Sequence, residues 1–144
     1  QFVVSADFEL VDYSEVSLGG QPGDEQYFND QNTIIQNRYG EVANMKLGAE
    51  LNLSKVLLRA GYASYGNPLG GDLTSTDPTA SVYSTEKEMY SVGFGKRNKF
   101  SYVDFAFVFS EGSYTTWLYN AYYTPPVKVV STNYSLLLTM GWKF

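Results

Sequence analysis

The feature that most constrains this chain is a period of two in its apolar residues. In segment 42–53 every second residue is apolar, and the residues between them are polar or glycine, apart from Val42. Successive side chains of a β-strand point to opposite faces, so this pattern predicts a strand with one apolar and one polar face. The pattern recurs and predicts an all-β fold of six antiparallel strands: Phe2–Leu18, Val42–Leu53, Val56–Tyr65, Met89–Arg97, one from Phe100, and one from about Val127 to Phe144.

The predicted connections alternate between short and long. Short turns are expected at Asn52–Lys55 and Lys96–Lys99, and long loops at about 19–40, 66–85 and 112–126. Short turns on one rim and long loops on the other are typical of outer-membrane β-barrels. With six strands, the C-terminal end of the chain lies on the short-turn rim. Within the first loop, "NDQNTIIQNRYG" predicts a short helix with Asn29 or Asp30 as its N-cap and Gly40 as its stop.

Alternation alone also fits a soluble β-sandwich or a lipocalin-like barrel, whose apolar face points inward. The polar face here is poor in long charged residues and rich in Gly, Ser, Asn and Ala, which favours a crowded or wet interior. Aromatic residues also gather near predicted strand ends, as in the girdles of membrane barrels, although aromatics favour strands anyway. A mean hydropathy of −0.24 does not exclude a membrane, because alternating spans of ~9–11 residues are hidden in hydropathy averages. We therefore expect a transmembrane antiparallel β-barrel wall.

Composition narrows the classes of function. The chain carries a net charge of −5 and no basic stripe, so we expect no nucleic-acid partner. It contains no Cys and no His, which removes thiol nucleophiles, imidazole bases and Cys/His zinc sites. No acid–base or metal motif stands out elsewhere. We expect no enzyme activity, no cofactor and no metal site.

Four blocks of the sequence resemble a known family. These are "ADFELVDYSEVSL" (6–18), "MKLGAELNLSKVLLRAGYASYGNP" (45–68), "YSVGFGKRNKFSYVDFAFVFS" (90–110) and "LLLTMGWKF" (136–144). In order and spacing they resemble the C-terminal part of the OmpP1/FadL/TodX outer-membrane transport proteins, in the form found in Bacteroidetes. The resemblance implies a location in the bacterial outer membrane, a fourteen-stranded barrel with an N-terminal plug, and passive uptake of fatty acids or other hydrophobic small molecules.

The chain departs from that family in having only six predicted strands and no plug. An open sheet edge in lipid would leave backbone groups unpaired. We therefore expect residues 1–144 to be a single C-terminal portion of a larger barrel, completed by strands of the same or another chain. A six-stranded sheet completed by self-association is the rival interpretation. Expected partners are membrane lipid, a hydrophobic small-molecule substrate and the barrel-assembly machinery.

Several charged residues are expected on the face turned to the lumen, where they could shape the field of a conduit or pair across strands and stiffen the wall. Candidate pairs are Glu9 with Lys46, and Glu50 with Arg59. The predicted lumen-facing set is Asp7, Glu9, Lys46, Glu50, Arg59, Asp104 and Lys143.

Two aromatic groups complete the candidate sites. The first is an outer cluster that could meet a hydrophobic substrate at the mouth or anchor the membrane interface, formed by Tyr114, Trp117, Tyr119, Tyr122 and Tyr123. The second is the terminal pair Trp142 and Phe144, which ends a lipid-facing row. By the resemblance, Phe144 matches the C-terminal aromatic read by the assembly machinery. Besides transport, a structural or binding subunit of a larger outer-membrane assembly and a soluble lipid-binding barrel stay open.

Overall fold

The computed structural model describes the whole chain except residues 22, 24, 70–83, 117, 120–123 and 144. The described residues form a single sheet of six strands whose spatial order follows the sequence, each antiparallel to the next. This confirms the all-β, antiparallel prediction. The strands are β1 (Phe2–Asp12), β2 (Glu41–Leu53), β3 (Val56–Tyr65), β4 (Ser84–Arg97), β5 (Ser101–Thr116) and β6 (Val127–Trp142).

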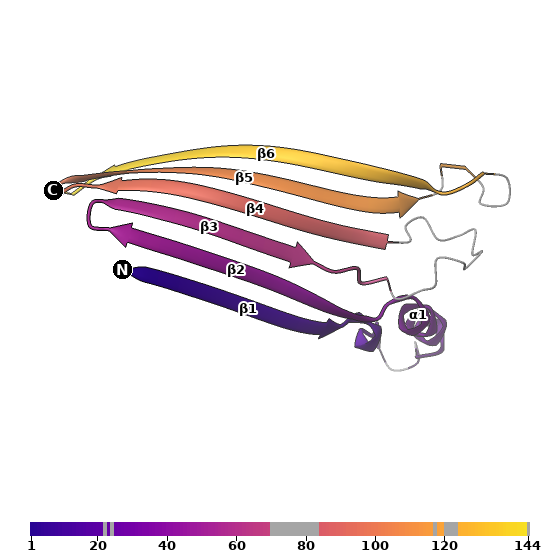
Figure 1. Cartoon of the computed structure of the whole chain (residues 1–144). Helices are drawn as coiled ribbons and strands as arrows, with labels where there is room; N and C mark the ends of the chain where they lie inside the picture. The colour runs from indigo at the N-terminus through magenta and orange to yellow at the C-terminus, as the bar shows by residue number, and fades with distance from the viewer. Residues whose placement is uncertain (22, 24, 70–83, 117, 120–123, 144) are drawn as a thin grey trace.

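The two ends of the sheet differ in the length of their connections. The short β2–β3 and β4–β5 turns and both chain ends lie at one end, and the long connections with helix α1 (Glu25–Arg38) lie at the other (Figure 1). In the β2–β3 turn Ser54 has φ +64°, and Leu53 pairs with Val56 across two turn residues. The short turns predicted at Asn52–Lys55 and Lys96–Lys99 are therefore confirmed.

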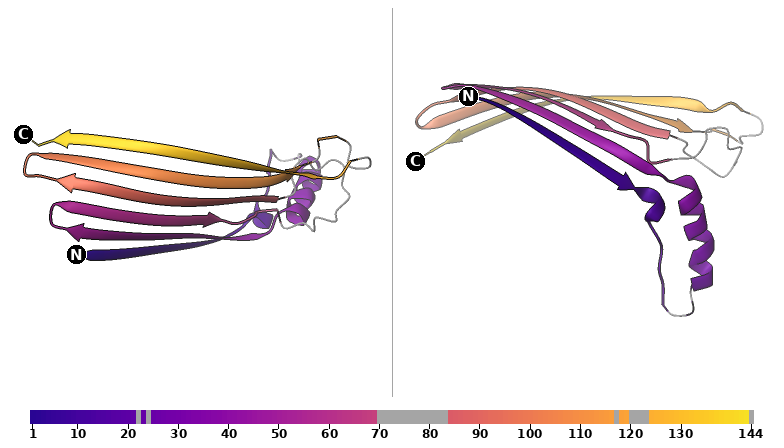
Figure 2. Two further views of the ribbon diagram at one scale, coloured as in Figure 1. Left: turned by 45° about the horizontal axis from the view of Figure 1, so that its top comes forward. Right: turned by 60° about the horizontal axis from the view of Figure 1, so that its bottom comes forward.

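The sheet is one layer thick and curved, and α1 projects from it beyond the ends of β1 and β2 (Figure 2). Among the described residues, the buried apolar side chains are Val42 and Leu57 and the buried polar one is Asn44. A sheet that buries so little on either face cannot be held by a core of its own. None of the described helices is long and apolar enough to cross a membrane.

The first strand is shorter than predicted. Strand β1 ends at Asp12, whose carboxylate accepts hydrogen bonds from the Ser14 backbone amide (2.9 Å) and the Ser14 hydroxyl (2.6 Å). These bonds cap a short 3₁₀ helix, η1 (Tyr13–Glu15), in place of the continued strand to Leu18. A local side-chain cap therefore outcompetes the alternation.

The loop helix begins earlier than predicted. Helix α1 starts at Glu25, not after Asn29 or Asp30, and it ends at Arg38 as the Gly40 stop signal suggests. Its Asn32 side chain accepts from Leu18 N (2.7 Å) and donates to Leu18 O (3.0 Å), which ties the helix to the segment that leads into it.

Strand β4 is longer than predicted, and β5 extends into an expected loop. Strand β4 starts at Ser84, within the expected 66–85 loop, because Thr85, Glu86 and Lys87 find partners on β5. Strand β5 runs to Thr116, so residues 112–116 of the expected 112–126 loop belong to that strand. Pairing with a long neighbour extends both strands beyond their clear alternation.

Candidate functional site: the charged concave wall

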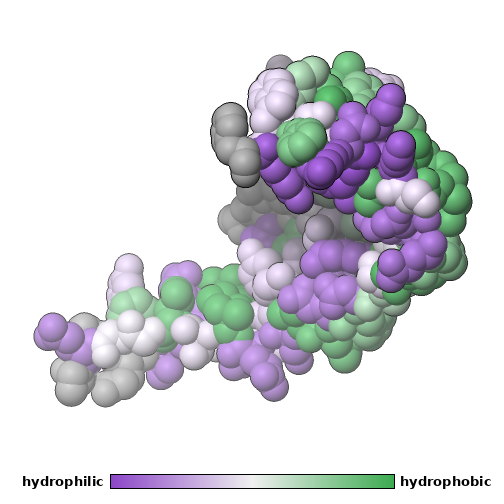
Figure 3. Space-filling view, turned by 90° about the vertical axis from the view of Figure 1, so that its left-hand side faces the viewer, coloured by the Kyte–Doolittle hydropathy of each residue, from purple (hydrophilic) through white to green (hydrophobic). Residues whose placement is uncertain are grey.

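The curved sheet has chemically different faces. Seen along the strands, its concave face is predominantly hydrophilic and its convex face predominantly hydrophobic (Figure 3). The register explains this, because residues directly opposite each other on neighbouring strands share a face. Large apolar side chains in the convex rows are strongly exposed, as for Phe8 (68%) and Leu136 (69%). The polar residues that alternate with them, including the predicted lumen-facing charges of the strands, share the concave face.

Four charged side chains form a network across the concave face. Arg59 on β3 lies directly opposite Glu50 on β2, and its Nε donates to Glu50 Oε2 at 2.7 Å. Its Nη1 lies 3.5 Å from Oδ1 of Asp104, which sits two strands away on β5. Arg97 on β4 closes the network, with Nη2 at 3.1 Å from Asp104 Oδ2. The network, defined as Glu50, Arg59, Asp104 and Arg97, therefore joins β2, β3, β4 and β5.

Glycines on β4 make room for this network. Gly93 lies opposite Arg59, and Gly95 lies opposite Asp104. A Cβ on Gly95 would contact the Asp104 carboxylate and would lie 3.4 Å from Leu57 Cβ. Strand β4 therefore presents a bare backbone over which Arg59 can reach β5, and Gly95 in particular leaves space for the Asp104 carboxylate.

An aromatic ring extends the network toward β6. The Arg97 guanidinium lies 5.1 Å from the centre of the Tyr102 ring, a cation–π geometry. Tyr102 lies opposite Gly141, where an added Cβ would collide with its ring. The ring thus covers a glycine backbone on β6, so one continuous set of contacts runs over five of the six strands.

The other predicted lumen residues pair locally. Lys46 lies opposite Asp7, with Nζ 3.4 Å from Asp7 Oδ2. Glu9 lies opposite Asn44, whose Nδ2 donates to Glu9 Oε2 at 3.1 Å. The prediction that Glu50 pairs with Arg59 is confirmed, and the prediction that Glu9 pairs with Lys46 is wrong. Glu9 lies two residues beyond Asp7 on β1, and the register places Asp7 opposite Lys46.

Lys143 stands apart from these pairs. It follows the last residue of β6 on the short-turn rim, where its backbone amide donates to Phe100 O at 2.8 Å. Arg97 was missed as a network member by the sequence reasoning. A signal existed, because Arg97 shares the alternation phase of Gly93 and Gly95 and therefore their face.

The convex face carries a row of aromatic rings in direct register. Tyr62, Tyr90, Phe109 and Tyr134 lie opposite one another on β3 to β6, with ring centres 5.1, 6.1 and 5.4 Å apart in sequence along the row. We call these four residues the aromatic row. The hydroxyls of its Tyr62 and Tyr90 donate to the two carboxylate oxygens of Glu88, at 3.1 and 3.0 Å. On the convex face, the aromatic row thus separates apolar residues on the side of the short turns from polar residues on the side of the long connections.

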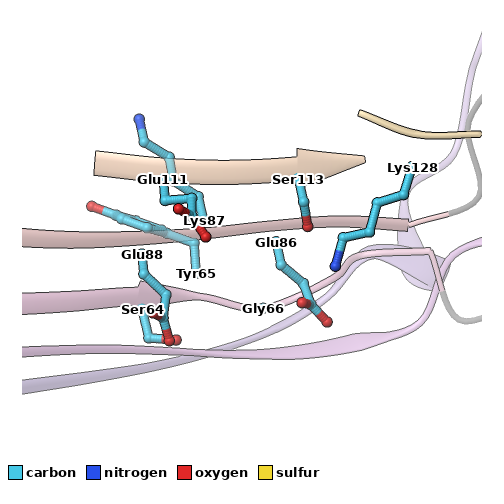
Figure 4. Close-up of a pocket in the computed structure, with 9 residues that line it drawn as sticks. All are labelled: Ser64, Tyr65, Gly66, Glu86, Lys87, Glu88, Glu111, Ser113 and Lys128. Carbon is cyan, nitrogen blue, oxygen red and sulfur yellow. The ribbon is translucent and has the colours of Figure 1, made fainter. Parts of the chain in front are cut away.

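Polar side chains line a shallow cavity of about 390 Å³ at the long-loop rim (Figure 4). Glu86, Ser113 and Lys128, from β4, β5 and β6, turn toward one another there, next to Glu88 and Glu111. Mixed charge of this kind suits a hydrated rim. Among the described residues no group of three or more acidic side chains could hold a metal ion.

The predicted outer aromatic cluster is only partly described. Tyr114 lies within β5, and Tyr119 lies in the following connection with 77% of its surface exposed. Trp117, Tyr122 and Tyr123 lie outside the described residues, so the cluster stays a prediction. Of the predicted assembly pair, Trp142 ends β6 opposite Ser101 and is 67% exposed, while Phe144 lies outside the described residues.

Comparison of the chain with known protein families, characterised proteins and solved structures gave no match. The resemblance to the OmpP1/FadL/TodX proteins therefore stays a prediction.

Proposed function

We propose that this chain forms part of the wall of a bacterial outer-membrane β-barrel of the fatty-acid transporter type, through which hydrophobic small molecules enter passively. The observation that carries the proposal is the polarity of the curved sheet, with an apolar convex face and a polar concave face (Figure 3). A soluble barrel would have the opposite arrangement, with an apolar interior and a charged exterior. The substrate class comes from the sequence resemblance.

The height of the apolar band supports a membrane setting. On β6 the aromatic row passes through Tyr134, and Trp142 ends the strand eight residues later. At ~3.4 Å per residue these two residues are about 27 Å apart along the strand, and about 20 Å apart along the membrane normal at a tilt near 45°. The lipid-facing band of outer-membrane barrels is ~25 Å tall with aromatic girdles at both interfaces.

The open edges of the sheet support a larger assembly. Strands β1 and β6 each have a neighbour on one side only in the described sheet. In lipid every unpaired backbone amide or carbonyl costs several kcal/mol, so the edges require further strands. We propose that strands of the same or another chain supply them and that the barrel-assembly machinery inserts the product.

The charged network favours a second candidate, a non-transporting structural or binding subunit of a larger outer-membrane assembly. Ion pairs that cross β2 to β5 stiffen a wall and offer no apolar track to a hydrophobic substrate. The two candidates share the membrane wall and differ in whether a solute passes.

Fractionation and uptake separate these candidates. We expect the protein in the outer-membrane fraction, with a gel migration that changes on heating. Cells that lack the gene should accumulate labelled long-chain fatty acid more slowly, with uptake of a small hydrophilic sugar as the control. Loss of fatty-acid uptake alone supports transport, and unchanged uptake of both solutes supports the structural subunit. Recovery in the soluble fraction without heat-modifiable migration would overturn both.

A further inference from the structure

The short-turn rim gathers the positive charge of the chain. Five of its ten Lys and Arg residues lie there, and we call them the basic rim: Lys55, Lys96, Arg97, Lys99 and Lys143. The segments that form this rim, 52–56, 96–101 and 141–143, contain no Asp or Glu. Because the whole chain carries −5 and the basic rim contributes +5, the remainder carries −10. The fold therefore separates charge along the strand direction.

Hydrogen bonds between turns hold the basic rim together. The Arg97 amide donates to Lys55 O at 2.8 Å and links the two short turns. The Lys143 amide donates to Phe100 O at 2.8 Å and links the end of β6 to the β4–β5 turn. All five side chains are exposed. The charges thus belong to one continuous surface and not to separate loops.

Within the described part of the chain, four of these cations have no ion-pair partner. Arg97 pairs with Asp104, but among the described residues the ion pairs involve none of the four lysines. Lys99 lies 5.2 Å over the Phe100 ring, and that ring is 64% exposed. Lys96 lies opposite Val103, in the convex row next to the one that contains Trp142. Free ammonium groups therefore stand beside exposed aromatic and apolar surface.

We propose that the basic rim binds the phosphate groups of anionic phospholipids in the membrane leaflet that the short turns face. This inference rests on the proposed membrane wall. The apolar convex face runs directly into the basic rim, so an occupant of both surfaces needs acyl chains and an anionic head. Lysine suits this task because its stem can lie along apolar surface while its ammonium reaches the headgroups. A soluble anionic protein would match the charge but not the apolar surface.

Quenching of Trp142 fluorescence tests the proposal. The full protein, with whatever strands complete its sheet, carries Trp117→Phe so that Trp142 is the remaining tryptophan of this chain's two. Any tryptophan contributed by the completing strands is also replaced by Phe. This single-tryptophan protein is reconstituted into phosphatidylcholine vesicles that contain a small fraction of brominated phosphatidylglycerol. A parallel sample contains the same fraction of brominated phosphatidylcholine instead. We expect stronger quenching by the brominated anionic lipid at low salt, and loss of this preference in 0.5 M salt, a condition of about 4 Å screening length.

Matched variants locate the effect. Replacing Lys55, Lys96 and Lys99 by Gln should lower the preference by about fivefold per lysine, and the corresponding Arg variants should retain it. The control replaces Lys87 and Lys128 at the opposite rim by Gln and should leave the preference unchanged. Heat-modifiable migration confirms that each variant is folded.

The outcomes separate the inference from the proposed function. Equal quenching by both brominated lipids, or a preference that survives the triple Gln variant, overturns the basic-rim proposal while the membrane wall stands. No quenching by either lipid overturns the membrane wall itself, and the lipid proposal with it. An anionic preference that requires the three lysines supports both.

Discussion

Arg59 bridges two acidic side chains that lie three strands apart. Its Nε donates to Glu50 Oε2 at 2.7 Å on β2, and its Nη1 lies 3.5 Å from Asp104 Oδ1 on β5. The bridge is possible because the intervening strand β4 offers Gly93 opposite the arginine and Gly95 opposite Asp104. These two glycines thus leave the space across which Arg59 reaches Asp104.

Removal of Arg59 should weaken the sheet modestly. The side chains of these ion pairs are about one-fifth to one-half exposed, so solvent screens them and we expect each pair to contribute about 0.5–1 kcal/mol. Arg59→Met should lower the free energy of unfolding by about 1–2 kcal/mol because it leaves two carboxylates without their shared partner. A double-mutant cycle with Glu50→Gln in urea unfolding would measure the pair. A coupling energy of zero would contradict a stabilising bridge.

Gly95 should tolerate a side chain less well than Gly93. The methyl group of Gly95→Ala would displace the Asp104 carboxylate, while that of Gly93→Ala would lie at an ordinary 3.5 Å from Arg59 Cβ. We expect a loss of about 1–3 kcal/mol for Gly95→Ala, as for other overpacked sites. The matched Gly93→Ala variant should lose less than half as much in the same urea unfolding experiment. Equal losses would mean that glycine itself, and not the space for Asp104, matters here.

The β2–β3 turn should gain stability from a residue that accepts a left-handed backbone. Ser54 has φ +64°, a conformation that costs most non-glycine residues about 1 kcal/mol. Ser54→Gly or Ser54→Asn should therefore raise the free energy of unfolding by about 0.5–1 kcal/mol. Ser54→Val should lower it, because a β-branched residue disfavours this conformation. An ordering with Val above Gly would contradict the turn geometry.

The pKa of Asp12 should depend on Ser14. Hydrogen bonds from the hydroxyl and the backbone amide of Ser14 lower the pKa of the Asp12 carboxyl from its ordinary value. A carboxyl with a lowered folded-state pKa contributes stability above its unfolded pKa, and this contribution is lost as pH falls through the folded value. In Ser14→Ala the pKa should rise toward normal, as carbon NMR of the carboxyl would report. Ser17→Ala is the control, and an unchanged pKa in Ser14→Ala would contradict the cap.

Neighbouring leucines on β6 should differ in how strongly a charge destabilises them if the wall spans a bilayer. Leu136 lies opposite Phe107 in a convex row, and Leu137 lies opposite Ala106 on the concave face. Leu136→Arg should cost about 2–4 kcal/mol in a bilayer, as for lipid-facing sites near the midplane, whereas Leu137→Arg should cost much less. Vesicle-insertion yield and urea unfolding would measure the difference. A larger penalty at Leu137 would place the lipid on the other face.

Part of this fold could be predicted from local pattern. The strict alternation of 42–53 and the compact turn at 52–55 identify a hairpin, and the structure places its strands within one residue of the predicted bounds. The predicted strand bounds were wrong where a side-chain hydrogen bond ended a strand or where pairing with a neighbouring strand lengthened it. The Asp12 cap ended β1 early, and pairing with β5 lengthened β4 at its start.

The candidate site shows the same division. Alternation alone placed Asp7, Lys46, Glu50, Arg59 and Asp104 on one face. It could not predict that Lys46 pairs with Asp7 and not with Glu9. A period of two fixes the face on which each residue lies, but a shift of one strand by two residues keeps the faces and changes the pairs. Nor could it show that Arg97 on β4 pairs with Asp104 on β5, because that contact depends on how the two strands align.

The sequence by itself determined the strands, their two chemically distinct faces and the two kinds of rim, because these follow from the two-residue period of a strand and from local turn chemistry. Only the tertiary structure decided the register, the bridge at Arg59, the aromatic row and the gathering of five cations on one surface. Each of these joins residues from different strands, and their alignment depends on the register that turn geometry and side-chain packing set between neighbouring strands.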